Sequence, residues 1–382
     1  MSSKILYIVN DPAFFLSHRL PIAVKAKQNG YEVVVATGPG EEVEDINAAG
    51  IRHYLLPLTR GGTNPLAELR LFVSIARFFR LEQPDLVHLV TIKPVLYGGV
   101  LARLMRVPAM VAAISGMGYL FTDRRREAAR KFVEMFYRQA LGHKNSRVIV
   151  QNQADREALQ TMGALSNNQD VLIPGSGVDL EEFRSSPLPD GTPLVVLPAR
   201  MLWDKGVGEF VRAAEMLKKQ GVEAHFVLAG GHDLQNPSGV SLQQLETWKA
   251  QGPVEWWGNC RNMPDVLARA SFVVLPSFYR EGIPKALLEA AAAGRAIVTT
   301  DAPGCRDVVE SGKNGELVPI KDALALAQVM GRLLADRKLL EEMGRRSREK
   351  AEAEFGVERV VAAHMEIYRT LLAQVKMEGE NI

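Results

Sequence analysis

The stretch FVVLPSFYREGIPKALLEAAAAGRAIVTT, residues 272–300, contains a strand, a helix and a second strand in succession. The runs at 272–277 and 296–300 are short and rich in apolar, largely β-branched residues, whereas residues 284–293 are mostly Ala and Leu. This order of elements is typical of the unit that builds parallel sheets. We therefore predict an α/β fold in which helices cover both faces of a parallel sheet.

The same alternation runs through the rest of the chain. Further strands are predicted at 4–10, 31–37, 53–58, 85–90, 109–115, 147–152, 193–199, 224–231, 254–258 and 315–320. Helices are predicted at 17–29, 41–49, 65–81, 94–105, 124–141, 206–220, 238–250, 263–270, 304–310, 322–335, 337–354 and 357–375. Residues Ser185–Pro193, SSPLPDGTP, have the composition of a linker. We expect two Rossmann-like, doubly wound domains at 1–184 and 193–356, with a ligand cleft between the carboxyl ends of their strands.

Composition and charge exclude several classes of protein. The 382 residues carry a formal net charge of +2, without a Lys- and Arg-rich run dense enough for nucleic-acid binding. Cys260 and Cys305 lie far apart, which fits the reducing cytoplasm. The longest uncharged stretch, Val107–Thr122, is shorter than the ~20 residues of a membrane-spanning helix. We expect a cytoplasmic protein that contacts a membrane only at its surface.

The loop and helix start at 281–289 carry the strongest chemical signal. Glu281 lies in the loop and Glu289 in the helix, so both carboxylates can accept hydrogen bonds from the hydroxyl groups of one ligand. A helix start holds phosphate through its backbone N–H groups and its dipole. The residues expected at that start are Gly282, Ile283, Pro284, Lys285 and Ala286. The alternative is a helix that only caps itself and exposes its glutamates.

Arg200 and Lys205, in ARMLWDKG, follow the predicted strand at 193–199. Two cations at the mouth of the cleft suit a diphosphate whose negative charge grows as a sugar leaves it. The chain has no Asp-x-Asp and no cluster of residues at metal-ligand spacing. We therefore expect neither a metal ion nor another cofactor. Taken alone, the two cations could also be ordinary solvated charges.

Arg200 and Lys205, followed by Glu281 and Glu289 in EGIPKALLE, resemble the donor-site pattern of GT-B glycosyltransferases of family 4. The resemblance runs over nearly the whole chain. It implies retention of anomeric configuration, a nucleotide-sugar donor and a terminal helix, 357–382, that crosses back to the first domain. In that family the Arg and Lys bind the donor diphosphate, the first Glu contacts the sugar and the second the ribose. The resemblance places Asn259 and Cys260 where the backbone meets the nucleobase.

Two segments of the first domain resemble a narrower group. TIKPVLYGG at 91–99 and SGMGYLF at 115–121 are similar to bacterial transferases that extend saccharides linked to undecaprenyl diphosphate, among them N-acetylgalactosaminyltransferases. The resemblance implies a UDP-sugar donor carrying a HexNAc or a hexose and a lipid-linked acceptor. Gly116 then lies in a small-residue loop that lets a ligand approach the backbone, although such a loop could also be only a tight turn.

The chain departs from the family at one histidine. Many members carry His-x-His after the fourth strand, whereas this chain reads His88, Leu89, Val90. His18 and Lys93 are therefore our candidates for first-domain groups that reach the reaction centre or the acceptor diphosphate. The alternatives are a structural histidine and a solvated lysine.

The segment 124–141 predicts a basic amphipathic helix. Its cations neighbour several aromatic residues, as in helices that bind anionic lipid headgroups. They are Arg124, Arg125, Arg126, Arg130 and Lys131. We expect this helix to contact the cytoplasmic face of the inner membrane, the alternative being a core-packed helix with a solvated basic face.

Two other functions remain compatible with this pattern. A non-hydrolysing UDP-sugar 2-epimerase would share the fold but need no acceptor, and a catalytically silent scaffold protein would bind the sugar nucleotide alone. A nicotinamide dehydrogenase is disfavoured because NDPAFFLSH stands where G-x-G-x-x-G would follow the first strand.

Overall fold

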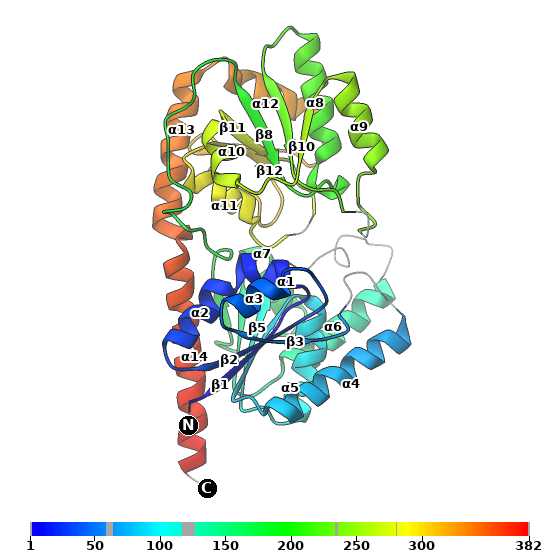
Figure 1. The fold of residues 1–382 in the computed structure, drawn as a ribbon, viewed down its shortest axis with the longest axis vertical. Helices are drawn as coiled ribbons and strands as arrows, with labels where there is room; N and C mark the ends of the chain where they lie inside the picture. Colours follow the sequence, from blue (N-terminus) through cyan, green and yellow to red (C-terminus); the bar gives the residue numbers. More distant parts are fainter. Residues whose placement is uncertain (1, 59–63, 117–126, 234–235, 280, 381–382) are drawn as a thin grey trace. The chain divides into compact units, whose positions relative to one another are not determined.

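The computed structural model describes residues 2–58, 64–116, 127–233, 236–279 and 281–380. The chain divides into two compact units, drawn in Figure 1. Unit 1 comprises Met1–Ser176 and Val357–Ile382, and unit 2 comprises Gly177–Gly356. Each unit is a doubly wound α/β domain with a fully parallel sheet, as the sequence predicts.

Unit 1 has seven parallel strands in the order β3-β2-β1-β4-β5-β6-β7. They are β1 (Lys4–Ile8), β2 (Glu32–Thr37), β3 (Arg52–Leu55), β4 (Leu86–Val90), β5 (Ala109–Ile114), β6 (Ser146–Val150) and β7 (Asp170–Leu172). The strand order reverses between β1 and β4, which pair directly. Strands β4 and β5 are buried along their whole length because helices cover both faces.

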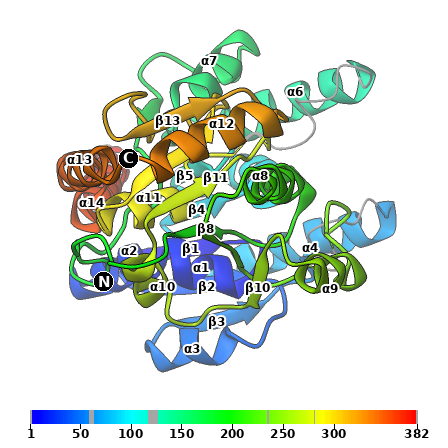
Figure 2. The same ribbon diagram turned by 90° about the horizontal axis from the view of Figure 1, so that it is seen from above.

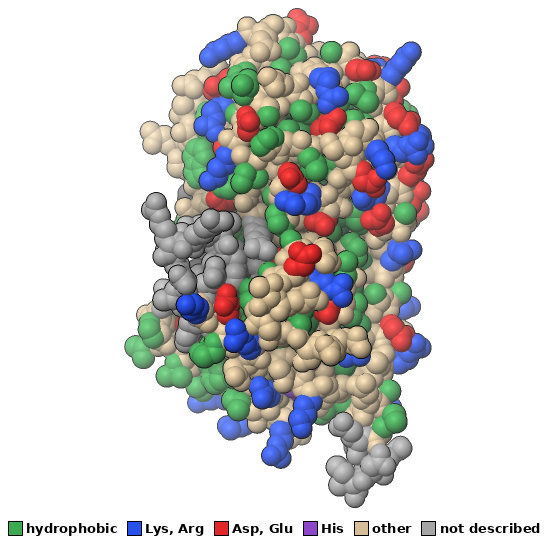
Figure 3. All heavy atoms as spheres, turned by 180° about the vertical axis from the view of Figure 1, so that it is seen from behind, with side chains coloured by type: hydrophobic (Ala, Val, Ile, Leu, Met, Phe, Trp, Pro, Cys, Tyr) green, Lys and Arg blue, Asp and Glu red, His purple; other side chains and the backbone are tan. Residues whose placement is uncertain are grey.

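The helices of unit 1 form two layers. On one face, α1 (Pro12–His18), α2 (Leu20–Gln28), α3 (Val43–Ala48) and α14 (Val357–Glu380) enclose one apolar core. On the other face lie α4 (Pro65–Glu82), α5 (Gly99–Leu104), α6 (Glu127–Leu141) and α7 (Gln153–Thr161). Hydrophobic and basic side chains meet on the surface of this second layer, at the lower left of Figure 3.

Unit 2 has six parallel strands in the order β10-β9-β8-β11-β12-β13. They are β8 (Leu194–Pro198), β9 (His225–Ala229), β10 (Glu255–Gly258), β11 (Phe272–Leu275), β12 (Ala296–Thr300) and β13 (Gly315–Val318). Its helices are α8 (Val207–Lys219), α9 (Leu242–Gln251), α10 (Met263–Arg269), α11 (Lys285–Ala292), α12 (Ala323–Leu334) and α13 (Arg337–Lys350). Helices α8 and α12 lie on one side of the sheet, and α10 and α11 on the other (Figure 2).

Three predicted helices differ most from the observed structure. The helix expected at 17–29 begins at Leu20 as α2, with Pro21 in its first turn. A separate helix, α1, precedes it, because Asp11 caps that helix by accepting from the Phe14 N–H at 2.9 Å. The helix expected at 94–105 begins with a π-helical segment, Pro94–Gly98, before α5. The helix expected at 304–310 is a series of turns, in which the Asp307 carboxylate accepts from the Gly304 N–H at 2.8 Å.

The boundary between the units also differs from the prediction. The predicted linker at 185–193 belongs to unit 2, where the Arg295 guanidinium donates to the Ser186 carbonyl at 2.7 Å. Arg337 likewise donates to the carbonyls of Leu188 and Pro189 at 2.8 and 2.9 Å. These bonds come from arginines more than 100 residues further along the chain. The chain therefore passes between the units at Ser176–Gly177 and again at Gly356–Val357.

The terminal helix α14 completes unit 1. The Tyr368 hydroxyl lies 2.8 Å from the Tyr7 hydroxyl of β1 and 2.6 Å from Nδ1 of His88 in β4. The Asn145 amide donates to the Leu371 carbonyl at 3.1 Å. Burial lowers the pKa of His88 well below its ordinary value, so the imidazole is neutral at pH 7. His88 is thus a buried partner of the terminal helix.

Candidate active site

The predicted donor residues of unit 2 gather at the point where its strand order reverses. Arg200 and Lys205 follow β8, and Glu281 follows β11, the neighbouring strand. From these two strands the chain builds the sheet outward in opposite directions. Ligands of open α/β sheets bind outside the carboxyl ends of the strands at such a point. The topology therefore supports a ligand site here.

Lys205 and Glu281 form an ion pair between the two loops. The side chains are 16% and 14% exposed, so solvent screens this pair less than a surface pair. The other carboxylate oxygen of Glu281 accepts from the Ser277 hydroxyl at 2.7 Å. The pair thus holds a cation and a carboxylate, side by side, at the carboxyl edge of the sheet.

Backbone contacts fix the two loops against each other. The N–H groups of Phe278 and Tyr279 donate to the Asp204 carbonyl at 3.0 and 3.3 Å. Gly206, with φ +75°, begins the approach to α8, and a Cβ there would lie 2.2 Å from the Pro276 carbonyl oxygen. Only glycine allows both this φ and this close approach. The position of Lys205 relative to Glu281 is therefore set by the backbone.

Arg200 pairs with a carboxylate of another loop than the one that carries Glu281. Its guanidinium pairs with Asp233, in the loop after β9, at 2.6 Å and is 51% exposed. Asn259, after the edge strand β10, is close to the same loop, because a Cβ on Gly231 would lie 3.7 Å from that of Asn259. Cys260, next to Asn259, donates to the Gly258 carbonyl at 3.7 Å. These residues line the carboxyl edge on the side away from β12.

The loop between β11 and α11 is enclosed by the segment after β12. Helix α11 begins at Lys285, one residue later than predicted, with Pro284 as the preceding cap residue and Ala286 in its first turn. Gly282, Ile283 and Pro284 are buried. A Cβ on Gly304 would lie 1.5 Å from the Gly282 carbonyl oxygen, so the two backbones are in direct contact.

Glu289 lies on α11, where its carboxyl group is 16% exposed. Burial raises the pKa of Glu289 to about 7, although Lys285, whose Nζ is 3.8 Å away, opposes the shift; the nearby Glu182 contributes to it. Because the folded state holds the proton more tightly than the unfolded chain, stability is lost as the pH rises from about 4.5 to about 7.

Replacing Glu289 with glutamine is expected to remove this loss. The wild-type chain should lose about 3 kcal/mol of unfolding free energy between pH 4.5 and pH 8 relative to the Glu289→Gln variant. Urea unfolding at a series of pH values measures the difference. Glu310→Gln is the control: because lysine partners lower the pKa of Glu310, its substitution should change stability in the opposite direction. Parallel pH profiles for wild type and Glu289→Gln would contradict the burial argument.

Three candidates of unit 1 lie at the carboxyl edge of its own sheet. His18 ends α1 and stacks on Phe14, with ring centroids 4.0 Å apart. Lys93 follows β4 and pairs with Glu68 at 2.7 Å. Gly116, two residues after the end of β5, is buried with φ +99°, a conformation that favours glycine. Their predicted roles stay predictions.

The candidate membrane residues are only partly described. Arg124, Arg125 and Arg126 lie outside the described residues. Arg130 belongs to α6, but its side chain also lies outside the described part. Lys131 is exposed on α6.

The sequence reasoning missed Arg19, a residue that is only 1% exposed. It donates to the His18 carbonyl at 3.0 Å and to the Ser115 hydroxyl at 3.5 Å, so it connects the segments after β1 and β5. Within the described residues, no carboxylate pairs with Arg19, and its Nε has no hydrogen-bond partner. Burial lowers the pKa of Arg19 to about 10, so the guanidinium stays charged at pH 7. In the sequence, only its position next to the candidate His18 could have pointed to Arg19 as a site residue.

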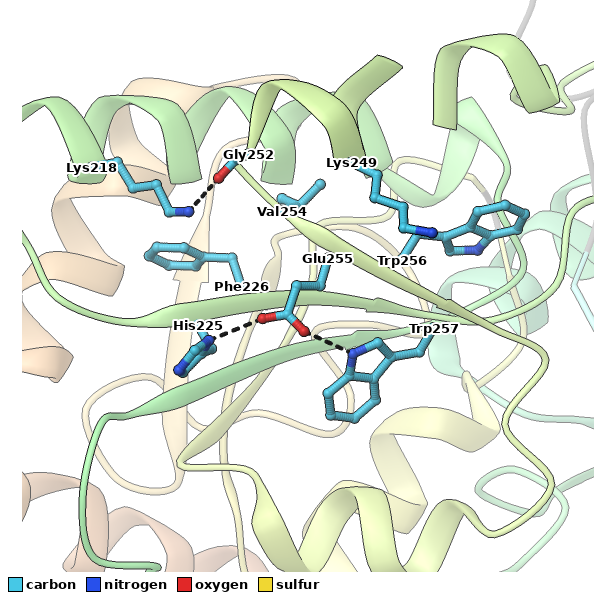
Figure 4. Close-up of a pocket in the computed structure, with 9 residues that line it drawn as sticks. All are labelled: Lys218, His225, Phe226, Lys249, Gly252, Val254, Glu255, Trp256 and Trp257. Atoms are coloured by element: carbon cyan, nitrogen blue, oxygen red, sulfur yellow. Dashed lines mark hydrogen bonds and ion pairs between the residues drawn. The ribbon is translucent and has the colours of Figure 1, made fainter. Parts of the chain in front are cut away.

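A separate small cavity of about 210 Å³ lies at the opposite, amino edge of the second sheet (Figure 4). It lies between the starts of β9 and β10 and the ends of α8 and α9. In this cavity Glu255 accepts from Trp257 at 3.0 Å and pairs with His225 at 2.9 Å. None of the predicted donor residues lines it.

The described residues contain neither a metal-ligand cluster nor a membrane-spanning helix. No three His, Cys, Asp or Glu side chains in that part of the chain gather as a metal site would require. Among the same residues, no helix is both long and apolar enough to cross a membrane.

Family models match both halves of the chain. Residues 4–152 match the family described as Glycosyl transferase 4-like, and residues 192–336 match Glycosyl transferases group 1. The solved structure of sucrose-phosphate synthase from Thermosynechococcus elongatus has a TM-score of 0.79 and 22% identity, covering 97% of this chain and all of that one. Anabaena HepE, solved with UDP and glucose, has a TM-score of 0.77 and 18% identity over 96% and 99% of the two chains. The fold and the two matches define a glycosyltransferase.

More specifically, the chain carries two glycosyltransferase domains of the GT-B fold, one 4-like and one of group 1. It is 29% identical to the N,N'-diacetylbacillosaminyl-diphospho-undecaprenol alpha-1,3-N-acetylgalactosaminyltransferase of Campylobacter jejuni, over 85% of this chain and 90% of the relative. It is 23% identical to the UDP-Gal:alpha-D-GlcNAc-diphosphoundecaprenol alpha-1,3-galactosyltransferase of Escherichia coli, over 83% and 84%.

Proposed function

We propose that this glycosyltransferase moves a HexNAc or a hexose from a UDP-sugar to a saccharide linked to undecaprenyl diphosphate, with retention and without a metal ion. The ion pair of Lys205 and Glu281 at the switch point carries the proposal, because it places a cation for a diphosphate beside a carboxylate for a sugar. Two relatives bear diphospho-undecaprenol acceptors in their names, and one names UDP-Gal as its donor. These names support the acceptor and the donor class.

In the proposed reaction, the bond between the anomeric carbon and the diphosphate oxygen breaks. Lys205, Arg200 and the start of α11 stabilise the negative charge that develops on the departing UDP. The acceptor hydroxyl forms the new bond on the face that the diphosphate leaves, and its proton passes to an oxygen of the leaving phosphate. Glu281 holds the sugar and Glu289 the ribose. A side chain carrying a trapped covalent sugar would contradict this mechanism.

The proposed place of the reaction is the cytoplasmic face of the inner membrane, in surface-polysaccharide or glycan assembly. A lipid-linked acceptor confines the reaction to a membrane surface. We propose that the cationic segment 124–141, which includes the basic helix α6, contacts that surface.

UDP release by the purified protein tests the proposal. The assay uses a panel of UDP- and GDP-sugars in the presence of EDTA, with and without short undecaprenyl-diphosphate-linked acceptors. We expect acceptor-dependent release that persists in EDTA and is lost in Lys205→Ala and Glu281→Ala. Lys313→Ala is the matched control, because Lys313 forms an exposed ion pair of the same unit with Glu310.

The other outcomes of the assay separate the rival functions. A changed sugar configuration without acceptor would indicate a 2-epimerase. Nucleotide binding without any turnover would indicate a scaffold protein. Loss of transfer in EDTA, restored by Mg²⁺ or Mn²⁺, would overturn the metal-independent mechanism.

A further inference from the structure

Helix α4 of unit 1 has a second apolar face that points outward. Its inner face packs Leu71, Ile75 and Phe78 into the core. On the outer face, Leu66 is 77% exposed, Leu69 60%, Val73 40% and Leu81 67%. An ordinary surface helix carries polar residues opposite its buried stripe. The outer face of α4 therefore calls for an explanation that core packing does not give.

Arginines alternate with these apolar residues on the same face. Successive residues of an α-helix are rotated by about 100° around its axis. On α4, the outward-facing arc of about 120° therefore contains only Leu, Val and Arg residues. They are Leu66, Leu69, Arg70, Val73, Arg77, Arg80 and Leu81, which we call the α4 outer face. All seven are exposed.

The two acidic residues of α4 do not neutralise this face. Glu68 pairs with Lys93 at 2.7 Å. Glu82 is buried and pairs with Lys4 and Arg52 at 3.1 and 2.8 Å. Among the described residues, no ion pair joins Arg70, Arg77 or Arg80 to a carboxylate. The α4 outer face is therefore both apolar and cationic.

Helix α13 of unit 2 is a basic helix that faces water, and its charge pattern differs from that of the α4 outer face. Its arginines pair along the helix with glutamates, as Arg345 does with Glu342 and Arg346 with the same carboxylate at 3.0 Å. Such pairs are typical of a solvated face. On α4, leucines occupy the outward positions between the arginines, where α13 carries glutamates.

We propose that the α4 outer face docks on an anionic lipid bilayer. Leucine side chains enter the boundary between headgroups and acyl chains, while guanidinium groups bind lipid phosphates. Basic residues near such a surface each strengthen binding severalfold at low salt. This surface belongs to unit 1, whereas the predicted donor residues belong to unit 2. It adds a second contact to the membrane location proposed above, and its test does not depend on transferase activity.

Vesicle flotation of the full-length protein tests the proposal. The vesicles contain phosphatidylcholine with 30 mol% phosphatidylglycerol, or phosphatidylcholine alone, in 0.1 M and 0.5 M salt. We expect binding to the anionic vesicles that weakens at high salt. The triple variant Arg70→Gln, Arg77→Gln, Arg80→Gln should bind roughly 100-fold more weakly. The triple variant Leu66→Ser, Leu69→Ser, Val73→Ser should bind at least about tenfold more weakly.

The matched control removes three positive charges from exposed positions of unit 2. It is Lys219→Gln, Lys249→Gln, Lys338→Gln, and it should float like the wild type. Because all substituted side chains are exposed, thermal unfolding should be unchanged in every variant. Equal loss in the control, no flotation of the wild type, or undiminished flotation of both α4 variants would each overturn the proposal. The last result would assign membrane contact to another surface, such as the basic helix.

An activity measurement separates this inference from the proposed function. The α4 variants should transfer sugar to a short, water-soluble acceptor as fast as the wild type, but more slowly to an acceptor embedded in anionic vesicles. An equal loss on both acceptors would contradict a docking role. If no acceptor is used at all, the transferase proposal fails, while flotation still decides the membrane surface.

Discussion

Replacing Lys205 with methionine is expected to lower kcat for sugar transfer by about 10³-fold, because the cation beside the departing diphosphate is lost. A single preorganised group of this kind typically contributes 10²- to 10³-fold to kcat, and a charged one lies at the upper end. The Lys205 ammonium is held by Glu281 and by the backbone contacts between the two loops, so little reorganisation is needed at reaction. Steady-state kinetics with saturating acceptor measures the effect.

The same substitution should also destabilise unit 2. Without its cation, the largely buried Glu281 carboxylate loses its charge partner, which costs about 3 kcal/mol. The double variant Lys205→Met, Glu281→Gln removes both charges and should recover most of this stability while remaining inactive. Arg200→Met should cost less activity than Lys205→Met, since Arg200 is half exposed and pairs with Asp233. A double variant with wild-type kcat would show that the pair is only structural.

Replacing Gly304 with alanine is expected to destabilise the chain by more than about 4 kcal/mol. The new Cβ would lie 1.5 Å from the Gly282 carbonyl oxygen, far inside van der Waals contact, and no side-chain rotation can relieve a clash with backbone. The loop that carries Glu281 must therefore move, so UDP affinity should fall with stability. Urea unfolding and calorimetric titration with UDP measure the two effects.

Gly312→Ala is the matched control for the clash. Gly312 has φ +78°, close to the +84° of Gly304, but a Cβ there would meet nothing within 4 Å. The substitution should cost only the roughly 1–2 kcal/mol of a left-handed alanine and leave UDP binding intact. The close-contact argument fails if the two variants unfold with similar free energies.

Local sequence patterns predicted most strands and helices because those patterns reflect local burial. The apolar run at 85–90 became β4, and the 3.6-residue periodicity at 65–81 became α4. The start of α1 was missed, although Asp11 followed by Pro12 is a helix-start signal. The π-helical segment at Pro94–Gly98 could not be predicted, because its hydrogen-bond pattern leaves no distinct mark in composition.

Contacts between distant parts of the chain set the limits of the prediction. The Pro- and Ser-rich segment at 185–193 has a linker's composition, yet Arg295 and Arg337 hold it in unit 2. In the candidate site, Arg200, Lys205 and Glu281 could be named from their motif, and the switch point explains why they share one edge. Arg19 could not, because burial of a guanidinium depends on strands that lie far away in sequence.

The discontinuity of unit 1 has a consequence for biosynthesis. Unit 2 is one uninterrupted stretch, Gly177–Gly356, whose ends meet where the Val178 N–H donates to the Phe355 carbonyl at 2.9 Å. A ribosome therefore finishes unit 2 before it makes the helix whose Tyr368 binds Tyr7 and His88. Since domains tend to fold as they emerge, the inserted unit can fold first. The apolar residues of the first sheet that α14 covers then remain exposed until the last part of the chain has been made.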